Sequence, residues 1–139
     1  MAENTEYLET QLIEWLAENT QMPTPPTDLY VALWSANPAN APDSTNEITG
    51  DSYSVQSVST SGGWVRDVTG GPTRDENDSV VDFGVLDSST QKSVEGVVIF
   101  DGSDTSTANA LMYDDDISET VAAGNEFRFP AGDLNLEQD

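Results

Sequence analysis

The sequence predicts a mainly β fold, an antiparallel β-sandwich of about eight short strands (jelly-roll or Ig-like) with one N-terminal α-helix. Two observations lead to this fold class. Apolar residues first recur at three-to-four spacing, which is the helical period. After a cluster of prolines, the apolar segments become short and strand-like, and turn residues separate them. A chain of 139 residues is the size of one ordinary domain with its own core.

The N-terminal segment is predicted to be an amphipathic helix with a hinge, together residues 1–22, and the sandwich domain spans residues 23–139. Asn4 or Thr5 can cap the helix, and Pro23 follows its end. Its apolar stripe consists of Leu8, Leu12, Ile13, Trp15 and Leu16. Two roles for the stripe stay open. It either packs on the body of the domain or docks on a neighbouring subunit, with an assembly interface formed by Leu8, Leu12, Trp15 and Leu16.

Eight segments after the hinge have the pattern of strands. Residues 29–34 and 94–100 are nearly all apolar, as expected for strands that are covered on both faces. The eight segments are residues 29–34, 53–58, 64–68, 80–86, 94–100, 110–113, 127–129 and 134–136. Longer loops are predicted over residues 35–50 and 70–78, where Asn, Pro, Gly and acidic residues gather.

Negative charge dominates the composition. The chain has 26 Asp and Glu residues against four basic ones, which gives a formal net charge of −22. In dilute buffer, repulsion between so many like charges destabilises the folded chain. At 1 M salt the Debye length falls to about 3 Å, and this repulsion is screened. The near-absence of lysine and the even spread of acids indicate adaptation to concentrated salt. The alternative is an acidic protein from an ordinary host.

Composition also excludes several classes of function. The chain has no cysteine and no histidine, so thiolate metal sites and His-dependent catalytic triads are excluded. A polyanion repels phosphates, so no direct contact with nucleic acid is expected. No apolar run is long enough for a membrane span and no signal peptide precedes the helix, so we expect no membrane insertion and synthesis in the cytoplasm.

Clusters of acids are the candidates for a metal site. Calcium takes six to eight oxygen ligands, often from a loop with carboxylates and carbonyls. The calcium candidates are Asp101, Asp104, Asp114, Asp115 and Asp116. The alternative is that these are solvated acidic turns, which is common in so acidic a chain. No other cofactor is expected, and no pair of carboxylates stands out as catalytic.

Several segments together resemble a family of small virion proteins from tailed phages and related archaeal viruses, often labelled tail fibre protein. Its members carry a Leu-Tyr-Leu-Ala-Leu-Phe-Thr-Ala-x-Pro strand and end in Ala-Ala-Gly-Asp and Phe-x-Ala-Gly-Asp-Leu motifs. The matching segments here are residues 25–38, 50–53, 81–87, 109–113, 121–126 and 129–134. The resemblance covers nearly the whole chain.

The resemblance implies a structural component of a tailed-virus particle: a tail fibre, a capsid turret or spike, or a decoration protein. With the charge, it implies a virus of salt-loving archaea. Such a protein would act by assembly as a homo-oligomer, a trimer or pentamer, with other virion proteins. The alternative is a carbohydrate-binding module for host surface glycans, with one of Trp15, Trp34 and Trp64 exposed in a groove. A hydrolase is the third hypothesis.

Overall fold

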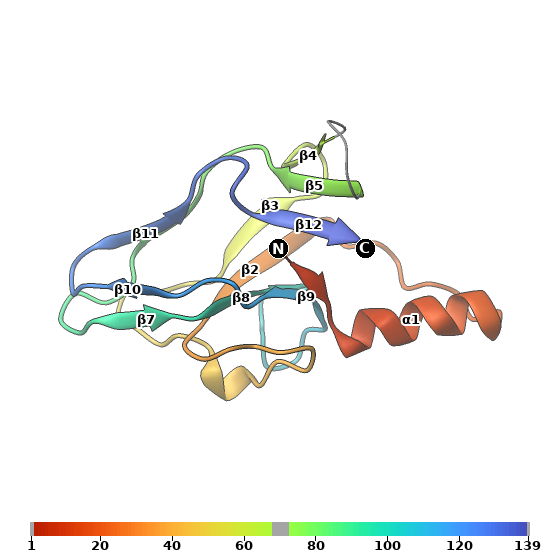
Figure 1. Cartoon of the computed structure of the whole chain (residues 1–139), viewed down its shortest axis with the longest axis horizontal. Coiled ribbons are helices and arrows are strands. Elements are labelled where there is room, and N and C mark those ends of the chain that lie inside the picture. The colour runs from red at the N-terminus through yellow and green to blue at the C-terminus, as the bar shows by residue number, and fades with distance from the viewer. Residues whose placement is uncertain (1, 68–72, 139) are drawn as a thin grey trace.

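A computed structural model describes residues 2–67 and 73–138, which contain one α-helix and twelve strands joined in antiparallel ladders (Figure 1). The helix α1 is Glu6–Ala17, and a short 3-10 helix covers Ser44–Asn46. The strands are β1 Glu3–Asn4, β2 Asp28–Trp34, β3 Gln56–Ser59, β4 Trp64–Asp67, β5 Thr73–Asn77, β6 Val81–Val85, β7 Lys92–Val94, β8 Gly96–Phe100, β9 Ala110–Asp114, β10 Glu119–Val121, β11 Glu126–Phe129 and β12 Asn135–Gln138. The predicted mainly β fold with one N-terminal helix is confirmed.

A five-stranded sheet of order β1-β9-β8-β2-β3 forms the centre of the molecule. Its two middle strands pair with Tyr30 opposite Phe100 and Ala32 opposite Val98. All five residues of β8 are buried. These are the two segments that the sequence predicted to be covered on both faces, and the structure confirms it.

One face of this sheet packs against the strand pairs β6-β11 and β7-β10. Alternate residues of the central strands point this way, among them Val31, Leu33 and Val97. They meet a group of aromatic rings, in which Phe127 and Phe129 pack edge to face with centroids 5.2 Å apart. This is the core of the sandwich.

The opposite face of the sheet is covered by loops. Trp34 and Phe100 stack here with ring centroids 5.7 Å apart, in a cluster that also contains Tyr113. The indole Nε1 of Trp34 donates to the carbonyl oxygen of Asp43 at 3.0 Å. The predicted long loop, residues 35–50, is therefore fastened over an apolar face, which explains how a loop of that length stays ordered.

A third sheet, β12-β5-β4, corrects the prediction of a loop over residues 70–78. Its central strand reads Thr-Arg-Asp-Glu-Asn and has no apolar alternation. Ion pairs between β4 and β5 take the place of apolar contacts. Arg66 pairs with Asp75, and Arg74 pairs with Asp67. The first three residues of the predicted loop and the end of the predicted strand at Val68 lie outside the described residues.

Other boundaries also differ from the prediction. Strands β1, β7 and β10 are only two or three residues long, too short for a periodic pattern. Residues 53–55 precede β3, because Tyr53 turns inward and its hydroxyl accepts from the backbone N of Leu33 at 3.0 Å. Ala2 is buried and β1 pairs with β9, so the first residues join the sheet. The division at residue 22 stays a prediction.

Asn77 joins the third sheet to the rest of the molecule. Its side chain is buried, donates to the carbonyl oxygens of Ser79 and Pro130 at 2.8 and 2.9 Å, and accepts from the backbone N of Leu134 at 2.9 Å. An alanine here leaves the buried backbone N of Leu134 without its partner, which costs about 1–3 kcal/mol, and it removes two bonds to carbonyl oxygens of the exposed residues Ser79 and Pro130.

We therefore expect Asn77→Ala to lower the free energy of unfolding by about 1–3 kcal/mol. Urea titration in 3 M salt, followed by circular dichroism, measures this difference. The exposed Asn40 provides the control, since Asn40→Ala should leave the unfolding midpoint almost unchanged. Equal midpoints for both variants would contradict the role of Asn77.

Candidate assembly surface

Helix α1 is fastened to the body at its first turn. Of the two predicted caps, Asn4 and Thr5, it is Thr5 that caps the helix, with its Oγ1 accepting from the backbone N of Leu8 at 3.4 Å. The same hydroxyl donates to the carbonyl oxygen of Ala110 at 2.5 Å, and the backbone N of Thr5 donates to Leu111 at 3.0 Å. Both partners belong to β9, so the cap is also the joint between helix and sheet.

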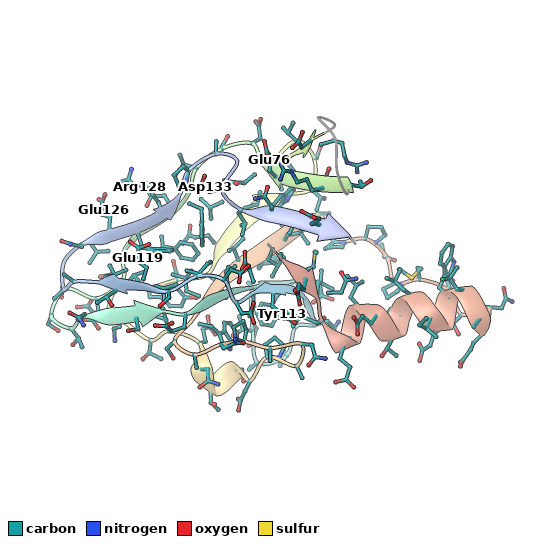
Figure 2. The ribbon with its side chains drawn as sticks, in the orientation of Figure 1. Glu76, Tyr113, Glu119, Glu126, Arg128 and Asp133 are labelled. Atoms are coloured by element: carbon teal, nitrogen blue, oxygen red, sulfur yellow. The ribbon has the colours of Figure 1, made fainter. Side chains whose placement is uncertain are left out.

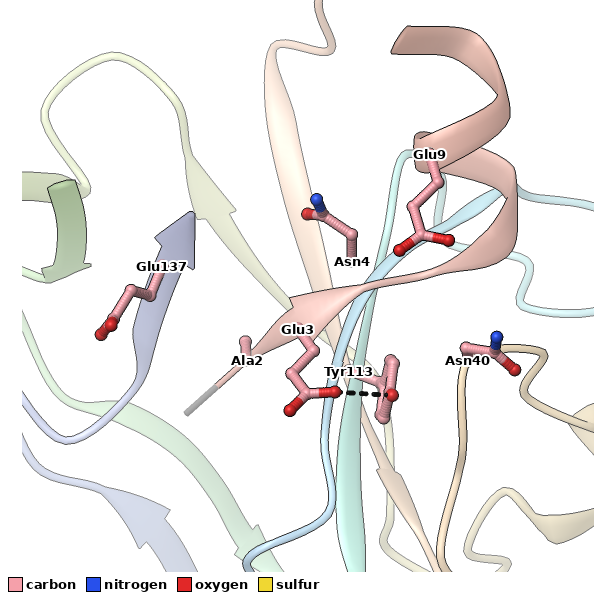
Figure 3. A pocket seen from close by; sticks show the side chains of 7 residues that line it. All are labelled: Ala2, Glu3, Asn4, Glu9, Asn40, Tyr113 and Glu137. Carbon is pink, nitrogen blue, oxygen red and sulfur yellow. Dashed lines mark hydrogen bonds between the residues drawn. The ribbon is translucent and has the colours of Figure 1, made fainter. Parts of the chain in front are cut away.

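An acidic pocket lies beside the joint between α1 and β9, which we call the root of the helix (Figure 3). Glu3 of β1, Glu9 of α1 and Tyr113 of β9 line it, together with Glu137. The hydroxyl of Tyr113 donates to Oε2 of Glu3 at 2.8 Å, and the two residues lie directly opposite each other in the β1-β9 ladder. This bond fixes β1, and through β1 the direction in which α1 leaves the body.

Beyond its first turn, α1 extends away from the body (Figure 1), and its contacts with strands are mainly with β9 and β1. Ile13, Trp15 and Leu16 are 61%, 52% and 70% exposed. Full burial of side chains of this size is worth about 1.5–3 kcal/mol each. The helix therefore carries a large apolar surface that this chain leaves in water.

The four predicted interface residues divide along the helix. Leu8 packs beside the buried Ala2, Ile99 and Met112 and belongs to the root. Leu12 is half-buried, whereas Trp15 and Leu16 are exposed. Ile13 adds to the exposed surface, and the four predicted interface residues do not include it. It lies three residues before Leu16, and that spacing makes the two side chains neighbours on a helix.

The sequence of α1 also gives the helix little stability of its own. It is 12 residues long, a length at which isolated helices are marginal in water. Its last turn has no basic residue to offset the macrodipole, and Glu14 and Glu18 lie near that end instead. A helix of this kind gains most of its stability from packing of its apolar face.

The structure separates the two groups of predicted calcium ligands. Asp101 and Asp104 lie in the loop before β9, whereas Asp114 ends that strand and Asp115 and Asp116 follow it. The five residues of β9 therefore hold the groups roughly 13 Å apart, at about 3.3 Å per residue.

Most of these carboxylates have partners within the chain. Asp101 accepts from the backbone and side-chain nitrogens of Asn109 at 2.8 and 2.7 Å. Asp104 accepts from the Ser106 hydroxyl at 2.6 Å, which together with the Ser106 backbone N–H lowers its pKa. Within residues 2–67 and 73–138, no three acidic side chains are arranged to hold a metal ion. Calcium binding at either group stays a prediction.

The three tryptophans have different environments. Trp34 is fully buried, and Trp64 is partly buried against the core. Trp15 lines an open hollow between the end of α1 and the proline hinge, together with Asn19, Gln21 and Pro23. The expected exposed tryptophan is therefore on α1, where the same side chain also belongs to the apolar face.

Comparison with known proteins identifies one family. A family model described as podophage GP4 fiber I protein gp80 matches residues 3–137. No curated protein matches the chain. In the part of the chain that the structure describes, no helix is both long and apolar enough to cross a membrane.

The hydrogen bond between Tyr113 and Glu3 should make the stability of the folded state depend on pH in the alkaline range. Hydrogen bonding to the Glu3 carboxylate, with burial, raises the pKa of Tyr113 from 10.0 to about 12. The folded state thus favours the neutral phenol, so this stabilisation is complete below pH 10.0 and is lost as the pH rises to about 12. NMR titration of ring-labelled tyrosine should show Glu3→Gln moving the pKa of Tyr113 back toward 10.0, while Glu18→Gln leaves it unchanged. An unchanged pKa in Glu3→Gln would contradict the bond.

Proposed function

The chain belongs to the family of the podophage GP4 fiber I protein gp80, and from this premise we propose that it is a structural component of a tailed-virus particle that assembles through α1. The match covers nearly all of the chain and supports a virion structural role. A tail fibre, a capsid turret or spike, and a decoration protein all fit this role. The observation that carries the assembly mechanism is the exposed apolar face of α1.

The proposed partner of this face is another copy of the same chain. Most homo-oligomers have closed symmetry, and a trimer or pentamer brings α1 helices together around one axis. Trp15, Leu16 and Ile13 then bury surface that is exposed in the single chain. Around the axis, the glutamates of α1 come close together as well, so salt that screens them favours assembly.

We expect the wild-type protein to be a trimer or pentamer in 3 M KCl and the double variant Trp15→Glu, Leu16→Glu to be a monomer. Multi-angle light scattering gives the mass, and circular dichroism shows that the sandwich is retained. Val80→Glu is the control, because Val80 is 51% exposed but lies on the body. An unchanged mass in the double variant would rule out α1 as the interface.

The proposed adaptation to concentrated salt rests on the net charge of −22. Raising KCl from 0.1 to 3 M shortens the Debye length from about 10 Å to below 3 Å, which removes most of the repulsion between exposed carboxylates. We expect the thermal midpoint to rise over this range. A variant with Glu9, Glu18, Asp78 and Glu119 changed to the matching amides should show a smaller rise. The same salt dependence in both proteins would contradict screening as the cause.

A further inference from the structure

A ring of three or five copies needs two different surfaces on every chain. A twofold axis lets one patch meet its own copy, whereas a closed trimer or pentamer joins one patch of each chain to a second patch of the next. The exposed apolar side chains of α1, which are Ile13, Trp15 and Leu16, form one such patch, and we call it the knob. The receiving patch has to be concave, close to α1 and poor in charge, because burying an unpaired carboxylate is costly.

A groove beside the root of α1 has these properties. It lies between the first turns of α1 and the segments 40–44 and 105–110, and its volume is about 520 Å³. We call it the root groove. Among the described residues that line it, Glu6 alone is charged, in a chain whose net charge is −22. Tyr7, Pro42 and Phe100 give it apolar surface.

Other hollows of the described residues fit the knob less well. The acidic pocket of Figure 3 is lined by three glutamates. The hollow that is lined by Glu119, Arg128 and Asp133 lies on the body, away from α1 (Figure 2). The hollow between β3 and β6 has a volume of about 220 Å³, less than half that of the root groove. Of these hollows, the root groove alone combines size, low charge and nearness to α1.

The walls of the root groove are joined to one another. The backbone N of Glu6 donates to the carbonyl oxygen of Asn40 at 2.9 Å, which joins α1 to one wall. The hydroxyl of Thr5 donates to the carbonyl oxygen of Ala110, which joins α1 to the other wall. The groove is therefore formed before a partner arrives, and binding loses little free energy in ordering it.

We propose that the knob of one copy inserts into the root groove of the next copy. This inference rests on the proposed assembly through α1 and specifies its geometry. Thr10 of the groove and Ile13 of the knob are neighbours on one side of α1, so a helix that enters the groove continues along an apolar surface. Trp15 lies about 12 Å along the helix from Tyr7. Copies in a ring are related by rotation alone, so the helices are inclined to the axis and the tip of each points to the root of the next.

Two variants test this contact, because each keeps one half of it. The knob variant Trp15→Glu, Leu16→Glu retains the root groove, and the groove variant Thr10→Glu, Ala41→Glu retains the knob. Thr10 and Ala41 are exposed and line the groove from two sides, so the groove variant leaves the core intact. We expect each variant alone to be a monomer by multi-angle light scattering in 3 M KCl. A 1:1 mixture should form pairs with twice the mass of one chain, because one knob meets one groove and the ring cannot close.

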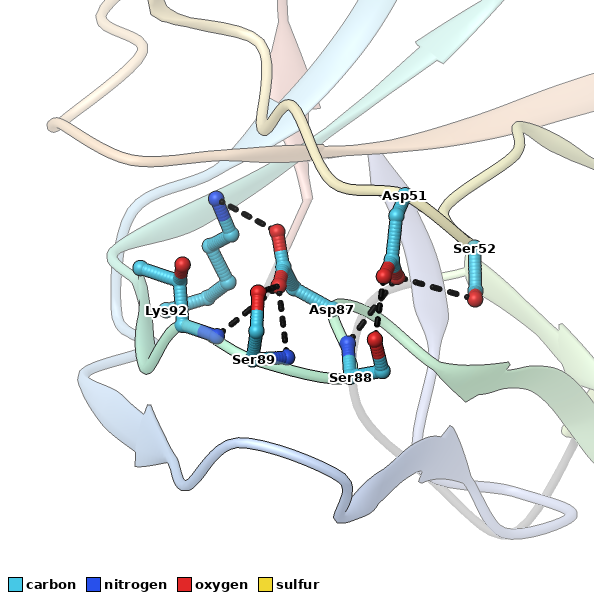
Figure 4. Close-up of polar contacts among 7 residues, drawn as sticks. Asp51, Ser52, Asp87, Ser88, Ser89 and Lys92 are labelled. Carbon is cyan, nitrogen blue, oxygen red and sulfur yellow. Dashed lines mark hydrogen bonds and ion pairs between the residues drawn. The ribbon is translucent and has the colours of Figure 1, made fainter.

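The matched control is Thr90→Glu, Ala123→Glu, which makes the same two changes at exposed residues of the end opposite α1 (Figure 1). There Asp87 accepts from the backbone nitrogens of Ser89 and Thr90 at 3.0 and 2.8 Å and holds the loop (Figure 4). This control should have the mass of the wild type.

Three results would overturn the inference, and they differ in what else they remove. A groove variant with the wild-type mass would exclude the root groove but leave assembly through α1 intact. A mixture that stays monomeric, with both variants folded by circular dichroism, would exclude the contact between knob and groove. A monomeric wild type would overturn the proposed assembly itself, and this inference with it.

Discussion

The pairing of β2 with β8 is the contact on which the rest of the structure depends. Both strands are covered on both faces, so successive side chains serve two different cores. Val31 and Val97 face the sandwich, while Ala32 and Val98 face the loops on the other side. A shift of register by one residue would exchange these two sets. The long loop over residues 35–50 and the aromatic core both depend on this one register.

The scarcity of basic residues constrains everything outside the core. All four are paired with carboxylates, and their positions divide into two groups. Arg66 and Arg74 hold together strands β4 and β5, which have few apolar contacts of their own. Lys92 and Arg128 pair with Asp87 and Glu126 near the other end of the molecule. The pairs differ in what they join, because Arg66–Asp75 and Arg74–Asp67 cross the β4-β5 ladder whereas Arg128 and Glu126 are two residues apart on β11.

The sequence predicted the elements whose apolar residues recur with a helical or strand period, because that period reflects which side chains are buried. The eight predicted strands correspond to strands of the structure, and Thr5 caps α1. The prediction failed for β5, whose polar residues are held by ion pairs and by two neighbouring strands distant in sequence. The period of α1 gave its apolar stripe correctly, but could not tell whether the body covers that stripe. That answer depends on where β1 and Thr5 direct the helix, which is a tertiary property.

The two ends of the molecule differ in the side chains that they expose. A subunit that joins a particle buries surface permanently, and apolar side chains such as Trp15 and Leu16 gain most from that. At the opposite end, the exposed loops are held by hydrogen bonds to the Asp87 and Asp51 carboxylates. Since β1 pairs with β9 beside α1, and β7 pairs with β10 at the other end, the proposed assembly surface and these loops lie on opposite sides of the central sheet's length (Figure 1).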